Sequence, residues 1–151
     1  MKLTSSTLRG NWGTLLLPVN VEEEIDYDLL EKEIDFLIDC KISGIYSFGS
    51  AGELHNVTEY EFQKVNEILA KKCHEAKMPF QIGVSHPFPK VTVERLKTLS
   101  ALQPAAFQFI LPDWVALSFE EVQAFVGQVC EAASGIPVVL YNPPHAKLVL
   151  A

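Results

Sequence analysis

The sequence predicts an α/β fold with a parallel sheet, on the basis of five apolar runs and the helical spacing of the segments between them. The runs cover residues 13–19, 45–48, 80–84, 106–111 and 137–141. Branched and aromatic residues dominate each run, and strands of this kind that alternate with helices are typical of a parallel sheet buried on both faces. No linker or low-complexity segment divides the chain, so we expect one domain with the order β-α-β-α-β-α-β-α-β.

The first helix is predicted from four apolar residues at positions i, i+4, i+7 and i+8. They share one helix face and are Leu30, Ile34, Leu37 and Ile38. Either Asp26 or Asp28 is expected to cap this helix. The acidic run 22–24 that precedes it is expected to be a solvated approach to the helix.

Capping boxes, in which a Ser or Thr is followed three residues later by Glu, predict the starts of two further helices. They are Thr58 with Glu61 and Ser118 with Glu121. These helices are expected to end near Cys73 and Ala133. A helix with weaker signals is predicted over 92–102, and Pro104 is expected to end it.

The recurrence of strands about every 30 residues fits two architectures. One is an open doubly wound sheet, and the other is a set of consecutive units of a (β/α)8 barrel. Periodicity alone does not choose between them. The first strand is not followed by Gly-x-Gly-x-x-Gly, and the segment 11–13 (NWG) stands there instead, so nucleotide binding is not expected.

Composition excludes several classes of protein. The chain has 151 residues, is 48% hydrophobic and carries a formal charge of -7, so it has enough apolar residues for a globular core and lacks the basic character of a nucleic-acid binder. No apolar run approaches the roughly 18 residues that a membrane span needs, and the N-terminal residues lack a signal-peptide pattern. We therefore expect a cytoplasmic protein that binds neither nucleic acid nor membrane.

Metal sites, disulfides and cofactors are not expected from the sequence. The histidines show no metal-binding spacing and are His55, His74, His86 and His145. The cysteines form no Cys-x-x-Cys pair and are Cys40, Cys73 and Cys130. We expect these cysteines to be small buried hydrophobic residues in a reducing compartment.

Two strand ends carry polar residues suited to chemistry. The segment 49–53 (GSAGE) follows one apolar run, and the segment 141–144 (YNPP) ends another. Ligands bind at the carboxyl ends of parallel strands, where glycines let the backbone approach and N–H groups can receive a carboxylate or phosphate. The simpler alternative is that the glycines only turn the chain and that Tyr141 is a core residue with its hydroxyl at the rim.

Taken together, these motifs resemble those of the dihydrodipicolinate synthase and N-acetylneuraminate lyase family. The supporting segments are 10–14 (GNWGT) leading into Pro18, 49–53 with Thr58 and Glu61 downstream, and 141–144. The resemblance spans nearly the whole chain. It implies a (β/α)8 TIM barrel, of which this chain covers about the first five strands and four helices. Residues 1–151 are then the N-terminal portion of a single barrel domain of about 300 residues.

The same resemblance implies a lyase or aldolase that forms or cleaves a carbon–carbon bond through a Schiff base between a lysine and pyruvate or a related 2-oxo acid. Tyr141 would be the catalytic proton relay, and Gly49, Ser50 and Ala51 would bind the carboxylate of the 2-oxo acid. No further cofactor is implied. Members of the family are usually homo-oligomers, as tetramers or dimers.

The chain departs from the family pattern at three positions. Ala51 stands where a second threonine is usual, Ala146 stands where synthases carry an arginine, and Trp114 stands where a neighbouring subunit contributes a tyrosine in synthases. These departures favour a member of the family other than a dihydrodipicolinate synthase. For Trp114 itself, a lid, an intersubunit contact and core packing are all open alternatives.

The Schiff-base lysine of the family falls beyond the end of this chain. The lysines present are assigned to predicted helices (Lys32, Lys64, Lys71, Lys72, Lys97) or to loops and termini (Lys2, Lys41, Lys77, Lys90, Lys147). Solvated lysines lack the burial or neighbouring charge that makes an amine reactive at neutral pH. The alternative function is therefore a non-catalytic half-barrel that binds a ligand or assembles with another copy through its open strand edges.

Overall fold

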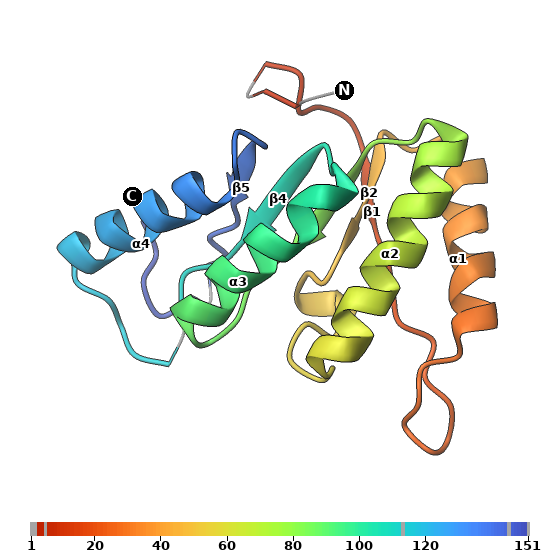
Figure 1. Cartoon of the computed structure of the whole chain (residues 1–151), viewed down its shortest axis with the longest axis horizontal. Helices are drawn as coiled ribbons and strands as arrows, with labels where there is room; N and C mark the ends of the chain where they lie inside the picture. Colours follow the sequence, from red (N-terminus) through yellow and green to blue (C-terminus); the bar gives the residue numbers. More distant parts are fainter. Residues whose placement is uncertain (1–2, 5, 113, 145, 151) are drawn as a thin grey trace.

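Five parallel strands form one sheet in the order β1-β2-β3-β4-β5, and a helix joins each strand to the next (Figure 1). This computed structural model describes residues 3–4, 6–112, 114–144 and 146–150. The strands are β1 (Trp12–Thr14), β2 (Gly44–Ser47), β3 (Phe80–Gly83), β4 (Ala106–Phe109) and β5 (Val138–Leu140). The helices are α1 (Tyr27–Asp39), α2 (Glu59–Ala76), α3 (Pro89–Leu99) and α4 (Phe119–Ala132), with short 3₁₀ turns η1 (Ser50–Gly52) and η2 (Ser100–Leu102).

The strand order decides between the two architectures that the sequence left open. A doubly wound sheet reverses its direction of growth at a switch point, whereas barrel units always add the next strand on the same side. Here every strand pairs with its successor in the chain, and no reversal occurs. The fold is an arc of a (β/α)8 barrel, and the doubly wound alternative is wrong.

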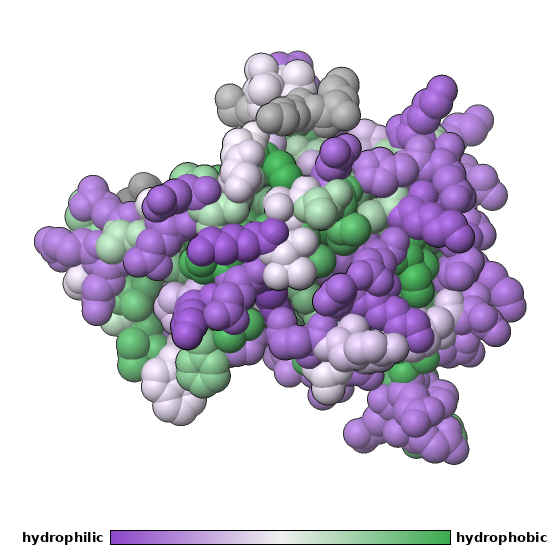
Figure 2. Space-filling model, viewed as in Figure 1, coloured by the Kyte–Doolittle hydropathy of each residue, from purple (hydrophilic) through white to green (hydrophobic). Residues whose placement is uncertain are grey.

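The helices cover one face of the sheet, and the main core lies between them (Figure 1). Residues of the central strands that point toward the helices are fully buried, among them Ile45, Ile82 and Phe107. The expectation of a sheet covered by helices on both faces is wrong for the described residues, because the opposite face borders a cavity. Figure 2 shows that the outer surface over α1 and α2 is largely hydrophilic.

The acidic run before α1 forms a projecting loop, visible below α1 in Figure 1 and as a hydrophilic protrusion in Figure 2. Asn20 organises this loop, because its side-chain oxygen accepts hydrogen bonds from the N–H groups of Glu22 and Glu24 at 3.0 and 2.9 Å. An isolated antiparallel bridge between Val19 and Ile25 closes the loop. The predicted solvation of residues 22–24 is confirmed.

The predicted caps of α2 and α4 are both present as complete capping boxes. Of the two residues predicted to cap α1, Asp26 is the cap, because its carboxylate accepts a hydrogen bond from the N–H of Leu29 at 2.9 Å. Helix α3 differs from its prediction, because Pro89 occupies its first turn and the helix begins three residues earlier. Lys90, which we expected in a loop, is therefore helical.

The described residues contain no helix that is both long enough and apolar enough to cross a membrane. The sheet also has two outer edges, at β1 and β5, that pair with no further strand in the described part of the chain. Unpaired strand edges present free N–H and C=O groups to other segments.

The three cysteines occupy different environments. Cys73 is fully buried on α2, and this burial raises the pKa of its thiol to about 12. Cys40 and Cys130 are exposed. The expectation of buried cysteines is confirmed for Cys73 and wrong for the other two, because they lie on the solvent-facing sides of their helix ends.

We expect an aromatic disulfide reagent to label two thiols quickly in the folded protein and the third only after denaturation, because only a thiolate at an accessible position reacts. The release of the coloured product over time measures this. A variant with Cys40→Ser and Cys130→Ser should release almost no coloured product while it is folded. Fast labelling of that variant would contradict the burial of Cys73.

Candidate functional site

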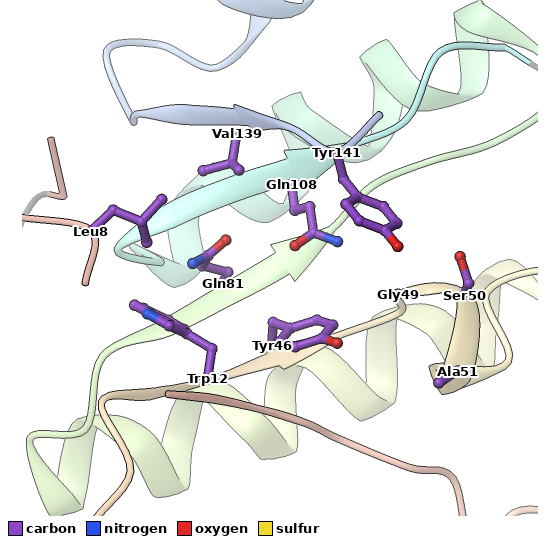
Figure 3. Close-up of a pocket in the computed structure, with 10 residues that line it drawn as sticks. All are labelled: Leu8, Trp12, Tyr46, Gly49, Ser50, Ala51, Gln81, Gln108, Val139 and Tyr141. Atoms are coloured by element: carbon purple, nitrogen blue, oxygen red, sulfur yellow. The ribbon is translucent and has the colours of Figure 1, made fainter. Parts of the chain in front are cut away.

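A cavity of about 390 Å³ lies on the face of the sheet that the helices do not cover. Figure 3 shows its side chains on that face, with the helices behind the strands. The lining residues come from all five strands, from the loops at the ends of β2 and β5, and from the N-terminal segment before β1; they are Leu8, Trp12, Tyr46, Gly49, Ser50, Ala51, Gln81, Gln108, Val139 and Tyr141. Because the strands are parallel, their carboxyl ends meet at one rim, and both predicted loops line this cavity.

The end of β2 brings the predicted loop over the cavity. Side chains alternate along the strand, so Tyr46 faces the cavity and Ser47 faces α2, where its hydroxyl donates to Asn66 Oδ1 at 2.6 Å. Phe48 then breaks the alternation with a φ of 50°, and its ring packs against Phe62 of α2 at 4.6 Å between centroids. The chain after Phe48 is thereby directed back toward Tyr46.

Gly49 is required at the point where the loop crosses Tyr46. A Cβ atom at this position would lie 2.6 Å from Cε2 of the Tyr46 ring, far inside contact distance. The 3₁₀ turn η1 follows, and the N–H of Gly52 donates to the carbonyl of Gly49 at 2.9 Å. In the described part of the chain, the N–H groups of Ser50 and Ala51 have no such partner, so the exposed start of this turn has donors available for an anion.

Tyr141 stands at the opposite side of the same cavity. Its N–H donates to the carbonyl of Phe109 at 2.8 Å, which continues the pairing of β5 with β4. The side chain is 43% exposed, and Figure 3 shows its hydroxyl directed toward the side on which Ser50 lies. The structure thus brings Gly49, Ser50, Ala51 and Tyr141 together around one space. Tyr141 does not pack in the core of the described residues.

Asn142 has a structural task beside this tyrosine. Its amide nitrogen donates to the carbonyl of Leu148 at 2.8 Å, and its side-chain oxygen accepts from the N–H of Leu150 at 2.7 Å. Both ends of the amide therefore hold the segment 148–150 against the end of β5. The prolines that follow Asn142 restrict the backbone at the same point.

Sequence reasoning missed six cavity residues: Leu8, Trp12, Tyr46, Gln81, Gln108 and Val139. Tyr46, Gln81, Gln108 and Val139 lie in runs that we classified only as apolar. A signal was available, because Gln81 and Gln108 are the only strongly polar residues within their runs. A polar residue at an alternate position of a strand marks a face that is not packed against helices.

The cavity lining contains no charged side chain and no lysine within the described residues. The same part of the chain also holds no group of three His, Cys, Asp or Glu side chains that could bind a metal. The described side chains of the cavity could therefore contact a ligand only through neutral hydrogen-bonding groups and apolar surface.

A second hollow of about 570 Å³ adjoins the first and shares Ser50 with it. Its apolar wall includes Leu54 and Phe88, and its polar residues include His86 and Arg95. Trp114 also lines this hollow and is 78% exposed, so it does not pack in the core of the described residues.

Arg95 connects this hollow to the helices. Its guanidinium is buried, donates to the carbonyl of Ser85 at 2.6 Å and to Glu59 through two nitrogens, and lies 3.9 Å above the centroid of the Phe62 ring. The hydrogen bond from Arg95 lowers the pKa of Glu59. For His86, burial and then the charge of Arg95 lower the pKa. The bidentate ion pair joins α3 to the start of α2.

We expect the ionisation of Glu59 to make the free energy of unfolding depend on pH. Because its pKa in the folded protein lies below its ordinary value of 4.5, its contribution is present above about pH 4.5 and is lost as the pH falls through the lowered value. Urea denaturation from neutral pH down to about pH 3 should show this loss in the unaltered protein. The Glu59→Gln variant should be less stable near neutral pH and lose less on acidification; equal losses in both proteins would refute the assignment.

Fold and cavity define a segment of a (β/α)8 barrel with a cavity lined by uncharged side chains on the face that the helices do not cover. The sequence matches the dihydrodipicolinate synthetase family over residues 7–150. The chain belongs to this family of class I aldolases.

Two curated relatives show the breadth of this family. The chain is similar to a 4-hydroxy-tetrahydrodipicolinate synthase from Thermomicrobium roseum, with 26% identity over 137 residues that cover 91% of this chain and 44% of the relative. It is also similar to an N-acetylneuraminate lyase from Salmonella paratyphi B, with 29% identity over 143 residues that cover 93% of this chain and 47% of the relative. The chain thus spans about half the length of the curated relatives it matches.

A solved structure supports the fold. A prophage protein of the dihydrodipicolinic acid synthase family from E. coli K12, solved in complex with pyruvate, superposes with a TM-score of 0.83. It is 20% identical, and the match covers 89% of this chain and 45% of that chain. The five strands described here therefore correspond to roughly half of a family barrel.

Proposed function

We propose that this chain is the N-terminal portion of a class I aldolase or lyase that acts on pyruvate or a related 2-oxo acid. The observation that carries the proposal is the meeting of the Ser50–Ala51 turn and Tyr141 on one cavity, in a chain of this family. The proposed reaction forms or cleaves a carbon–carbon bond through a Schiff base. Its lysine lies outside these 151 residues.

In this proposal the turn after β2 binds the carboxylate of the 2-oxo acid. The N–H groups of Ser50 and Ala51 and the hydroxyl of Ser50 would donate to the carboxylate of a small ligand, since glycine on either side keeps the backbone accessible. Hydrogen bonds to a carboxylate are charge-assisted and stronger than neutral ones. Binding of the carboxylate here directs the adjacent keto carbon toward the centre of the cavity.

Tyr141 is proposed as the proton relay. Attack of an amine on the keto group, loss of water and formation of the enamine each require a proton transfer, and a phenol beside the reacting atoms can supply it. The rim position of Tyr141 suits this task, because its hydroxyl reaches the cavity while its backbone is fixed to β4. The protonated imine then serves as the electron sink that makes covalent catalysis by an amine effective.

The remaining parts of the proposal concern the whole protein. Residues 1–151 contribute one portion of a single barrel, and the edges of β1 and β5 pair with its other strands. The protein is proposed to act in the cytoplasm as a homo-oligomer, either a tetramer or a dimer. Exposed Trp114 is a candidate for the subunit contact.

Borohydride trapping tests the Schiff base directly. The intact protein that contains this chain should gain the mass of one reduced pyruvate adduct per subunit when treated with pyruvate and borohydride. The 1–151 chain alone should gain none, because no lysine lines its described cavity. Absence of the adduct from the intact protein at saturating pyruvate would end the proposal.

Replacement of Tyr141 tests the relay. Tyr141→Phe in the intact protein should lower kcat by about 10²-fold or more while pyruvate still binds, because the phenol acts in proton transfer. Steady-state kinetics with a matched control, Tyr60→Phe at an exposed position on α2, separate this effect from loss of any tyrosine hydroxyl. An unchanged kcat in the Tyr141 variant would remove this residue from the mechanism.

The second candidate is a non-catalytic half-barrel that assembles with another copy, and the open edges of β1 and β5 favour it. Sedimentation of the isolated 1–151 chain distinguishes the two. A cooperatively unfolding dimer that traps no pyruvate in any form would favour the assembly module.

A further inference from the structure

We propose that Tyr46 is a third ligand-binding group of this site, and that Thr14 positions it. This inference rests on the proposed function, because its ligand is the carboxylate of the same 2-oxo acid. Neither residue belongs to the loops that the sequence singled out. Tyr46 belongs to the floor of the cavity, by which we mean the lining side chains of the central strands, Tyr46, Gln81 and Gln108, and Thr14 is its register partner on the neighbouring strand β1.

The hydrogen bond between Thr14 and Tyr46 orients the phenol. The Thr14 hydroxyl donates to the Tyr46 hydroxyl, and the two residues are partners in the register of β1 and β2. A phenol that accepts one hydrogen bond in this way retains its own O–H for donation elsewhere. Tyr46 lines the cavity, so this remaining proton is available to a ligand there.

The ring of Tyr46 is packed closely on one side by the backbone of the following loop. Gly49 crosses the ring so closely that a Cβ atom there would meet Cε2 at 2.6 Å. Figure 3 shows the Tyr46 hydroxyl directed toward the end of the cavity where Ala51 lies. The phenol therefore lies directly beneath the turn proposed to bind the carboxylate, with little freedom to move away.

The other polar groups of the floor show that it is built for a hydrogen-bonding occupant. Gln81, which is in register with Tyr46, is only 4% exposed, and its side-chain oxygen has no hydrogen-bond partner among the described residues. Figure 3 shows the Gln108 amide on the same face, between Tyr46 and Tyr141. A buried polar atom without a partner is costly, so a floor of this kind is suited to a polar ligand and unsuited to an apolar one.

A carboxylate would supply the hydrogen-bond acceptor that the O–H of Tyr46 lacks. Its two oxygens accept about four hydrogen bonds, more than Ser50 and the two N–H groups of the turn provide. No charged side chain lines the described cavity, so neutral donors have to balance the negative charge. The Tyr46 hydroxyl provides the fourth donor to the carboxylate. Because the carboxylate does not react, this hydrogen bond is equally strong in the ground state and in the transition state.

The test is Tyr46→Phe in the intact protein, with pyruvate as the probe. We expect the half-saturating pyruvate concentration for borohydride trapping, and the KM for pyruvate, to rise about 10-fold or more, because a hydrogen bond to a charged group is lost. The change in kcat should be smaller than that in KM, because the group binds ground state and transition state alike. This pattern is the reverse of the one expected for Tyr141→Phe.

Thr14 provides the positioning control. Thr14→Val removes the hydroxyl at constant volume and should raise the KM in the same direction, while Thr14→Ser should restore binding near that of the unaltered protein. Tyr60→Phe, at an exposed site outside the cavity, should change neither constant. Far-ultraviolet circular dichroism and thermal unfolding establish that each variant is folded, and Tyr46→Phe keeps the ring that packs under Gly49.

Two results would overturn the inference, and they differ. If the unaltered protein traps pyruvate and Tyr46→Phe binds it with an unchanged KM, the role of Tyr46 is refuted while the proposed function stands. If the unaltered protein traps no pyruvate, the proposed function fails and this inference fails with it.

Discussion

The site depends on a backbone reversal at Phe48, where a buried side chain forces an unfavourable conformation. A bulky residue with a φ of 50° costs on the order of 1–3 kcal/mol. Full burial of a phenylalanine contributes about 1.5–3 kcal/mol, and its ring contact with Phe62 adds about 0.5–1.5 kcal/mol. The packing on α2 therefore offsets the strain. Because Phe48 turns outward to this core, the next residue, Gly49, turns inward over Tyr46 and precedes the 3₁₀ turn that we propose as the carboxylate site.

The two faces of the sheet obey different requirements, although the strands are short. The outward positions are filled by branched and aromatic side chains packed under the helices, where the one polar exception, Ser47, is matched by Asn66. The inward positions carry a phenol and two amides. This difference arises because only the outward face meets helices in the described chain. The proposed binding of a polar ligand at this floor is consistent with these polar side chains, because aliphatic residues that suit a helix interface offer such a ligand no hydrogen bonds.

Local signals in the sequence were sufficient for much of the fold. The caps at Thr58 and Ser118 were predictable because a capping box involves only residues within one turn. The start of α3 was missed although Pro89 marks it, since proline at a first helical position looks like a loop residue. The parallel direction of the strands was predicted from their alternation with helices, but the strand order was not, because periodicity describes each strand and not its neighbour. The loops at 49–53 and 141–144 were found because glycine and proline mark chain turns directly.

The side chains on the floor of the cavity could not be predicted from apolar runs, because side chains alternate between the two faces of a strand. A run is classified by its average, whereas a cavity is lined by every second residue, so Tyr46 counted as one more aromatic strand residue. Its proposed role involves a hydrogen bond from Thr14, which is 32 positions away and becomes a neighbour only through strand pairing. No local pattern contains that contact. The same holds for Gly49, whose necessity follows from the ring beneath it and not from the turn alone.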